Sequence, residues 1–200
     1  NGQFLMSLPT SKKDIDILEE RGLWEASSVL YGRVKKLTNK GLALEIDCIK
    51  DAHRILFTVA RSISMAGKYR QHNGPKLKRI DGSVLPMLDW HLIPNAMAEL
   101  DMELRERTKN LKYPKSKEDY DSIIFIASHF SHKLASIHPF ENGNGRTSRL
   151  LMNAILLRAG LPEIAIKKSK PVYLRAMLQA DYGDFSLLED LITQGLIDAQ

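Results

Sequence analysis

Two long amphipathic segments that flank a short glycine turn constrain the fold of this chain more than any other feature. In residues 117–136, apolar side chains recur every three to four positions, which is the period of a helix with one buried face. A second helix is expected over residues 144–159, which Gly160 and Pro162 would end. The turn between them reads Gly143-Asn-Gly145. The residues expected on the buried face of the first helix are Ile123, Ile126, Ala127, Phe130, Leu134 and Ile137.

The rest of the chain is also mostly helical by this criterion. Ser11, with Asp14 three residues later, can cap a first helix, and Gly22 would stop it. Because proline is favoured in the first turn of a helix, Pro94 marks the start of another. Further helices are expected over residues 23–36, 47–64, 171–179 and 185–196. The apolar residues expected to face the core are Ile49, Ala52, Leu56, Val59, Ile63, Met97, Leu100 and Leu104.

Residues 67–86 have no helical period. Asp81-Gly82 lies between two short extended segments, and such a dipeptide predicts a β-hairpin with a type I′ turn, in which both central residues have positive φ. Pro75 and Pro86 restrict this hairpin to a small element at an edge. The expected fold class is therefore all-α with one small β-hairpin.

Composition excludes several classes of protein. Of the 200 residues, 44% are apolar, which is enough for a core and argues against disorder. Cys48 is the only cysteine, so a disulfide scaffold is excluded. The apolar runs are too short to span a bilayer and no signal region is visible, so we expect no membrane partner and a cytoplasmic location by default. The chain begins without Met, so a leader or a further domain could have been removed. The formal net charge of +5 suits an anionic partner and equally suits ordinary solubility.

The stretch with the most chemistry is residues 138–149, which read HPFENGNGRTSR. Its glycines allow successive backbone N–H groups to point to one place, and a helix with unpaired N–H groups begins directly afterwards. Arg146 and Arg149 share one face of that helix, where two cations oppose the helix dipole unless an anion binds. His138 can accept a proton near neutral pH. Together these features indicate a di- or triphosphate site with a histidine base. The alternative is a plain helix–helix turn with paired arginines and a core histidine.

At every defining position this segment matches the signature HxFx(D/E/N)GNGRxxR of the Fic family, which the chain resembles. The resemblance continues through residues 147–153 and 158–162, and before the signature it includes residues 67–70, the hairpin and Ile93-Pro94, so that it covers roughly residues 45–182. It implies a Fic-type helical bundle that transfers AMP from ATP to a Tyr, Thr or Ser hydroxyl of a target protein, with autoadenylylation as a further outcome. The expected organisation is an N-terminal helical segment (1–44), a Fic core (45–182) and a C-terminal helix (183–200).

By this resemblance, His138 is the general base that takes the proton of the target hydroxyl. Phe140 would lie beneath the loop, and Tyr173 and Asp181 would belong to the nucleotide pocket, although Tyr173 could equally pack in the core. The residues implied to hold the phosphates are Gly143, Asn144 and Gly145 through backbone donors, Arg146 at the β-phosphate and Arg149 at the γ-phosphate.

Position 142 departs from the most common pattern. Many Fic proteins have Asp or Glu there as the Mg²⁺ ligand, whereas this chain has Asn142. An amide oxygen can ligate Mg²⁺ but brings no charge, so we expect Mg²⁺ to be used and to be held weakly by the protein. The neighbouring Glu141 should face solvent.

The hairpin also has a physical interpretation. A short edge ribbon exposes unpaired N–H and C=O groups, so an extended target segment could add to it as a strand. In the Fic family a flap at this place holds the target over the histidine. The alternative is a surface hairpin that only covers the core. The candidate docking residues are Leu77, Ile80, Val84 and Leu85.

Many Fic proteins carry an inhibitory helix with the pattern (S/T)xxxE(G/N), whose Glu pairs with the second arginine of the signature. Ser27, Tyr31 and Gly32 match its frame, but a neutral phenol cannot pair with Arg149 as a carboxylate would. Either this helix no longer inhibits, or the match is a coincidence. We expect basal autoadenylylation that Tyr31→Glu would lower, and a separate inhibitor protein could supply the missing Glu.

Other constellations are weaker. His129 and His132 lie three apart on a helix without further ligands at matching spacing, so zinc is not expected. The lysines of residues 109–117 and 167–170 lack interleaved aromatic residues, so we expect a solvated face rather than nucleic-acid binding. A homodimer could form. Two alternatives to adenylyl transfer remain: a Fic-fold transferase that moves UMP, phosphate or phosphocholine, and a non-catalytic binding module.

Overall fold

The computed structural model of the chain describes residues 11–59, 63–74 and 78–199. This part of the chain folds into seven α-helices and one short 3₁₀ helix, so the expected all-α fold class is confirmed. The elements are α1 (Lys12–Asn39), α2 (Ile46–Val59), η1 (Trp90–Leu92), α3 (Ile93–Thr108), α4 (Lys117–Ile137), α5 (Asn144–Arg158), α6 (Lys170–Asp181) and α7 (Ser186–Asp198).

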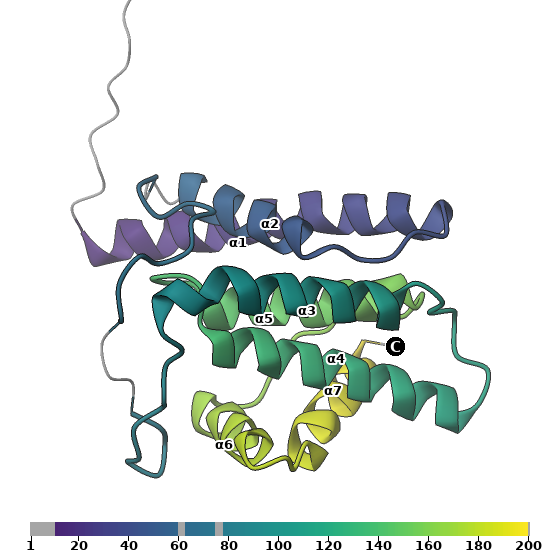
Figure 1. Cartoon of the computed structure of the whole chain (residues 1–200). Helices are drawn as coiled ribbons and strands as arrows, with labels where there is room; N and C mark the ends of the chain where they lie inside the picture. Colours follow the sequence, from purple (N-terminus) through teal and green to yellow (C-terminus); the bar gives the residue numbers. More distant parts are fainter. Residues whose placement is uncertain (1–10, 60–62, 75–77, 200) are drawn as a thin grey trace, which may run out of the picture.

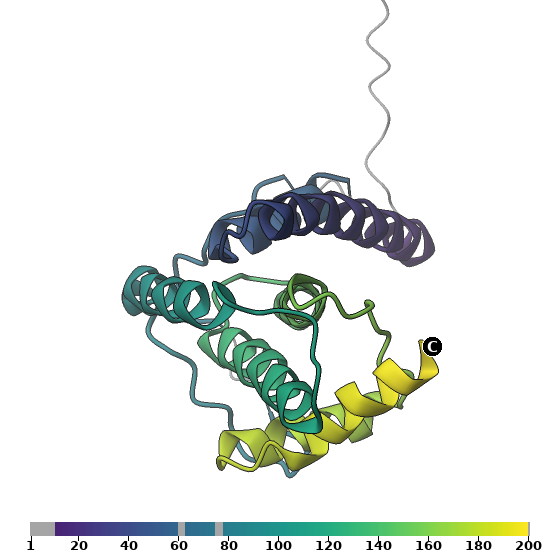
Figure 2. The same ribbon diagram turned by 90° about the vertical axis from the view of Figure 1, so that its right-hand side faces the viewer.

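The helices form stacked layers (Figure 1). The first layer consists of α1 and α2, which lie side by side; α3, α4 and α5 form the middle, and α6 and α7 cover the opposite side. Figure 2 shows α5 near the centre of the molecule, where it contacts α1, α2 and α4. The long connection between α2 and α3 runs down one side of the bundle to the level of α6. This connection contains the residues for which the hairpin was expected.

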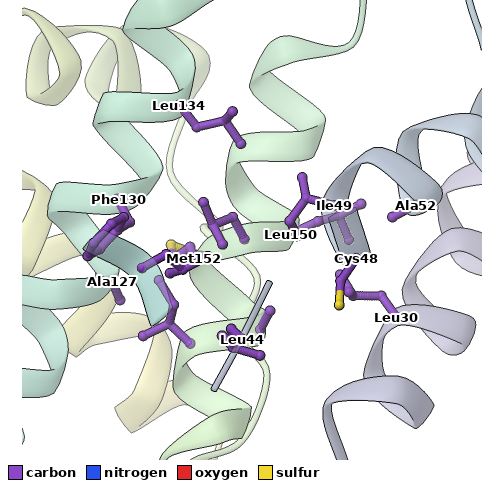
Figure 3. Packing of buried hydrophobic residues seen from close by; sticks show 14 of the residues in the cluster. Leu30, Leu44, Cys48, Ile49, Ala52, Ala127, Phe130, Leu134, Leu150 and Met152 are labelled. Carbon is purple, nitrogen blue, oxygen red and sulfur yellow. The ribbon is translucent and has the colours of Figure 1, made fainter. Parts of the chain in front are cut away.

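One hydrophobic core contains residues of α1 to α5 and of α7. Figure 3 shows part of it, with labelled side chains from α1, α2, α4 and α5. All the residues expected on the inner face of α4 are buried, as are Met97, Leu100 and Leu104 of α3. On α2 the expected stripe is only partly right, because the helix ends at Val59 and Ile63 lies in a turn with 67% of its surface exposed. In the described part of the chain, no helix has an apolar run long enough to cross a bilayer.

Gly22 does not stop a helix, so the prediction of two short N-terminal helices was wrong. Helix α1 is continuous from Lys12 to Asn39, and the side chain of Ser11 caps it by accepting a hydrogen bond from the backbone N–H of Asp14 (3.1 Å). Gly22 is buried against α2, where a Cβ atom would lie 2.5 Å from the carbonyl oxygen of Leu56. The glycine therefore permits a close approach of two helices, which a backbone without a side chain allows.

The expected β-hairpin does not form as a pair of strands in the described residues; the tight turn of residues 78–85 that stands in its place is called the hairpin below. Lys78 and Val84 form an isolated antiparallel bridge, and the described residues contain no regular strand. Gly82 has a φ of 84°, but Asp81 does not have a positive φ, so the predicted type I′ turn was wrong. The N–H of Gly82 donates to the carbonyl oxygen of Arg79 (3.0 Å), which closes a tight turn before the left-handed glycine. This arrangement is the common three-residue hairpin loop, in which only the final residue needs positive φ.

Candidate active site

The connection between α4 and α5 brings the candidate catalytic and phosphate-binding residues to one cavity. His138 directly follows α4, and Gly143 directly precedes α5. The cavity has a volume of about 730 Å³, and its other wall comes from the start of α6 and from the segment that precedes it. Besides His138, its lining includes Asn142, Gly143, Asn144, Gly145, Arg146 and Arg149.

The loop leaves the first N–H groups of α5 unpaired. Gly143 is the N-cap of α5 and has a left-handed φ of 80°, and a Cβ atom there would lie 2.6 Å from the ring of Phe57. The first N–H to find a backbone acceptor is that of Thr147, which donates to Gly143 O (2.9 Å); the described residues provide no acceptor for the N–H groups of residues 144–146. The positive end of the helix dipole and these donors therefore face the cavity, as an anion requires.

Asn144 and Phe140 hold the loop from beneath. The side-chain oxygen of Asn144 accepts from Phe140 N (2.9 Å) and its amide nitrogen donates to Phe140 O (2.8 Å). The ring of Phe140 is 1% exposed and stacks on His53, with the ring centroids 3.8 Å apart. The side chain of Asn144 thus fixes the loop, while its backbone N–H remains available to the cavity.

His53 of α2 is a loop-supporting residue that the sequence analysis missed. Its Nδ1 accepts from Gly67 N (2.9 Å), which leaves the proton on Nε2, and Nε2 lies 3.1 Å from Asn142 O and donates to it. Burial lowers the pKa of His53 to about 4, so both bonds persist at neutral pH. A signal existed in the sequence, because His53 lies four residues after Ile49, on the stripe of apolar residues that α2 buries.

Arg70 holds His138 in an unusual backbone conformation. His138 has φ 51° and ψ 57°, and no other non-glycine residue in the described chain has a positive φ. Such a conformation costs about 1–3 kcal/mol and needs support. Arg70 supplies it, because its Nε donates to His138 O (2.8 Å) and its backbone N donates to Pro139 O (2.9 Å). The guanidinium is 3% exposed, and its remaining donors bind the carbonyl oxygens of His72 and Leu88.

The surroundings of His138 favour a neutral imidazole. Burial lowers the pKa of His138 below its ordinary value and the charge of Arg70 lowers it further, although a hydrogen bond with the backbone of Ala135 acts in the opposite direction. The ring borders both the 730 Å³ cavity and a second cavity of about 470 Å³. A proton acceptor therefore lies where the two cavities meet.

The two arginines near the start of α5 have different partners. Arg146 Nη1 lies 2.9 Å from Glu19 Oε2 of α1, with side chains 19% and 27% exposed. Arg149 has no carboxylate partner within the described residues, and its guanidinium lies 5.5 Å from the ring centroid of Tyr173. The sequence analysis missed Glu19, which is 127 positions from Arg146 and carries no local signal that sets it apart from the other acidic residues of α1.

The second cavity lies between the hairpin and α6. Ile80 and Leu85 line it together with His138, so two of the candidate docking residues are brought to the histidine. Val84 lies outside this lining and is 49% exposed. Leu77 lies outside the described residues.

Asp181 anchors the hairpin to the helices. Its Oδ2 accepts from Arg79 Nε of the hairpin (2.7 Å), and its Oδ1 lies 2.9 Å from His132 Nε2 of α4. Both carboxylate oxygens are therefore occupied, although Asp181 lines the second cavity. Tyr173 lines both cavities, and its buried hydroxyl finds no hydrogen-bond partner in the described part of the chain.

The sequence model of the Fic/DOC family matches residues 43–156, more than half of the chain. This chain belongs to the Fic/DOC family. Among its relatives is the protein adenylyltransferase Fic of Nematostella vectensis, which is 36% identical over 150 residues, or 74% of this chain and 31% of that protein. This Fic chain thus spans about a third of the length of that curated relative.

Solved Fic structures have the same fold. A Fic domain containing signaling protein from Bacteroides thetaiotaomicron has a TM-score of 0.70 at 22% identity, with 90% of this chain and 70% of that chain covered. The BepC protein of Bartonella tribocorum, solved with bound AMPPNP, has a TM-score of 0.58 at 20% identity, with 83% of this chain and 85% of that chain covered. At these identities the likeness establishes the Fic fold.

The metal-ligating oxygens of the loop between α4 and α5 suit a Mg²⁺ ion that is already coordinated by phosphates. They are too few for a metal site formed by the protein alone. The side-chain oxygen of Asn142 accepts from Gly143 N (2.7 Å), and the exposed Glu141 lies 3.1 Å from His72 Nε2. The described residues form no group of three or more His, Cys, Asp and Glu side chains that could hold a metal. The protein would thus offer Mg²⁺ one neutral oxygen, that of Asn142.

Tyr31, which the sequence resemblance aligned with an inhibitory Glu, lies on α1. Its side chain lies near Ser27 of α1, near Asn153 of α5 and near Glu163, whose negative charge also raises the pKa of the phenol. Burial raises the pKa of Tyr31 to about 12, so the phenol stays neutral. Gly32 is exposed, with no heavy atom near the position of a Cβ. The expected effect of Tyr31→Glu remains a prediction.

Proposed function

We propose that this chain is the catalytic Fic part of a protein adenylyltransferase, which transfers AMP from ATP to a Tyr, Thr or Ser hydroxyl of a target protein. One observation carries the proposal: a neutral His138 lies at the edge of a cavity whose floor is a helix N-terminus flanked by Arg146 and Arg149. The relatives named protein adenylyltransferase support it.

The geometry supports a direct displacement at the α-phosphorus. The N–H groups at the start of α5 would bind phosphate oxygens, and Arg149 would neutralise the terminal phosphate. A target hydroxyl entering through the second cavity would lose its proton to His138 as its oxygen bonds to the α-phosphorus. The bond from that phosphorus to the bridging oxygen breaks, and pyrophosphate leaves. Mg²⁺ bound to the phosphates would supply further charge neutralisation, with Asn142 Oδ1 as its protein donor.

Labelled nucleotides test this function. The chain is incubated with a cell lysate and ATP labelled at the α-phosphate, and in parallel with ATP labelled at the γ-phosphate. Protein labelled only from the α-position, with a mass increase of one AMP on a hydroxyl side chain, is the expected result. Label from the γ-phosphate would indicate phosphate transfer. No label from either nucleotide would indicate a non-catalytic binding module.

Glu19→Gln is expected to strengthen ATP binding by roughly three- to ten-fold, because Arg146 must leave Glu19 before it can bind a phosphate. Isothermal titration with ATP measures this. Glu20→Gln is the matched control, since Glu20 is exposed on the same helix and has no ion pair within the described residues. Unchanged or weaker binding by the Glu19 variant would show that the ion pair does not compete with the nucleotide.

The pH dependence of transfer follows from the lowered pKa of His138. A histidine in water has a pKa of 6.5, and the neutral, proton-accepting form of His138 persists below that pH because its pKa is lowered. We expect kcat/KM, which reports the free protein, to reach half of its maximum below pH 6.5 and to fall as the pH drops through the lowered pKa. A half-maximal point at or above pH 6.5 would contradict the assignment of a desolvated base.

A further inference from the structure

We propose that Lys168 and Lys170 form a second cationic wall of the phosphate cavity, so that ATP binding depends little on Mg²⁺. The inference rests on the proposed function, since it takes the cavity to bind a nucleoside triphosphate. Both lysines lie outside the Fic signature: Lys168 precedes α6, and Lys170 is the first residue of that helix. In the sequence they belong to a polar run for which a solvated face was expected.

The two lysines share the cavity with the signature arginines. Lys168 and Lys170 line the same 730 Å³ space as Arg146 and Arg149, so four cations from two separate elements face one volume. Within the described residues neither lysine has a carboxylate within 4.0 Å, although the charge of Lys168 helps to lower the pKa of Asp198 on α7. Their neighbour Lys167 differs, because its Nζ lies 3.6 Å from Asp198 Oδ2 of α7 and it does not line the cavity.

The lining of the cavity carries little negative charge that could neutralise these four cations. Glu141 is the one acidic residue of the lining, and it is exposed beside His72. Position 142, which also lines the cavity, carries the neutral amide of Asn142. A carboxylate there would repel a bare triphosphate and would need a cation between the two groups, whereas an amide exerts no such repulsion.

The chemistry of lysine suits this role. An ammonium on a flexible stem can follow a phosphate chain and donate charge-assisted hydrogen bonds to its oxygens. Because both side chains are exposed, water and salt screen each contact, and the pair together should contribute about ten-fold to affinity. Protein cations would then perform much of the neutralisation that Mg²⁺ otherwise supplies.

The test measures ATP binding by isothermal titration, once in EDTA and once in excess Mg²⁺. We expect the dissociation constants of the unaltered chain to agree within about three-fold. In EDTA, the double variant Lys168→Ala, Lys170→Ala should bind ATP about ten-fold more weakly than the unaltered chain does. In Mg²⁺ its loss of ATP affinity should be smaller. Lys167→Ala is the matched control and should leave binding unchanged. Asn142→Asp should weaken binding in EDTA and make it strongly dependent on Mg²⁺.

Two results would overturn the inference: binding of ATP by the unaltered chain only with Mg²⁺, or full affinity of the double alanine variant in EDTA. A Lys168→Arg, Lys170→Arg variant should retain binding, which separates charge from local structure. The parallel α-label assay separates this failure from that of the proposed function. AMP transfer together with strictly Mg²⁺-dependent ATP binding would contradict only the inference about Lys168 and Lys170. A chain that binds no ATP in either buffer would contradict that inference and the proposed function as well.

Discussion

Replacing His138 by alanine is expected to reduce AMP transfer by about 10²–10⁴-fold, the range typical for loss of a general base, while ATP affinity stays nearly unchanged. The separation follows from the geometry. The phosphate donors come from the start of α5 and from side chains beyond the loop, whereas His138 lies where that cavity meets the one under the hairpin. Alanine therefore removes the proton acceptor and leaves the anion site in place.

The rate of α-label transfer and the dissociation constant for ATP should be measured on the same preparation. His129→Gln is a suitable control, because His129 also lies on α4 but its Nε2 faces Glu103, 3.6 Å away. The control should transfer AMP at the normal rate. If the His138 variant kept a rate within about three-fold of normal, a residue other than His138 would have to accept the proton.

Arg70→Met is expected to lower the free energy of unfolding by about 2–5 kcal/mol. The guanidinium of Arg70 donates to the carbonyl oxygens of His138, His72 and Leu88, and burial makes each lost donor expensive. The strained backbone of His138 also loses the hydrogen bond from Arg70 Nε that supports it. Urea denaturation measures the change. The stability of Arg70→Lys should lie between that of the unaltered chain and that of Arg70→Met, because an ammonium keeps the charge but cannot reach all three acceptors.

Catalysis should respond to the same substitution at temperatures where the variant is still folded. A His138 that leaves the left-handed conformation no longer presents its ring between the cavities, so kcat should fall more than KM for ATP rises. Arg70→Met with normal stability, or with lost stability but a normal kcat, would show that Arg70 does not position the histidine.

Local patterns in the sequence predicted the parts of the fold that depend on local physics. The apolar spacing of residues 117–136 and the stop at Gly160 are properties of one helix, and α4 and α5 follow them closely. Gly22 was misread because glycine serves both helix ends and close helix contacts, and only the position of α2 decides between these. The turn at Asp81-Gly82 was misread in type because several hairpin loops share a final left-handed glycine.

The candidate site divides in the same way. The residues from His138 to Arg149 are contiguous, so their sequence alone indicated an anion site at a helix start. Glu19 and Arg70 contact residues that are distant in the sequence. No local pattern predicts which distant residue an acidic side chain or an arginine will contact. Lys168 and Lys170 look in sequence like any exposed lysines, because a lysine that faces solvent and one that faces an open cavity obey the same local preferences.

The carboxylate of Asp181 has a consequence for how two substrates would share this protein. It ties Arg79 of the hairpin to the last turn of α6, and the same helix carries Lys170 and Tyr173 on the nucleotide side. An incoming polypeptide that shifts the hairpin would therefore also shift the part of α6 that we propose to contact the nucleotide. Donor and acceptor occupancy would then be thermodynamically linked, and each would alter the affinity for the other by the same factor.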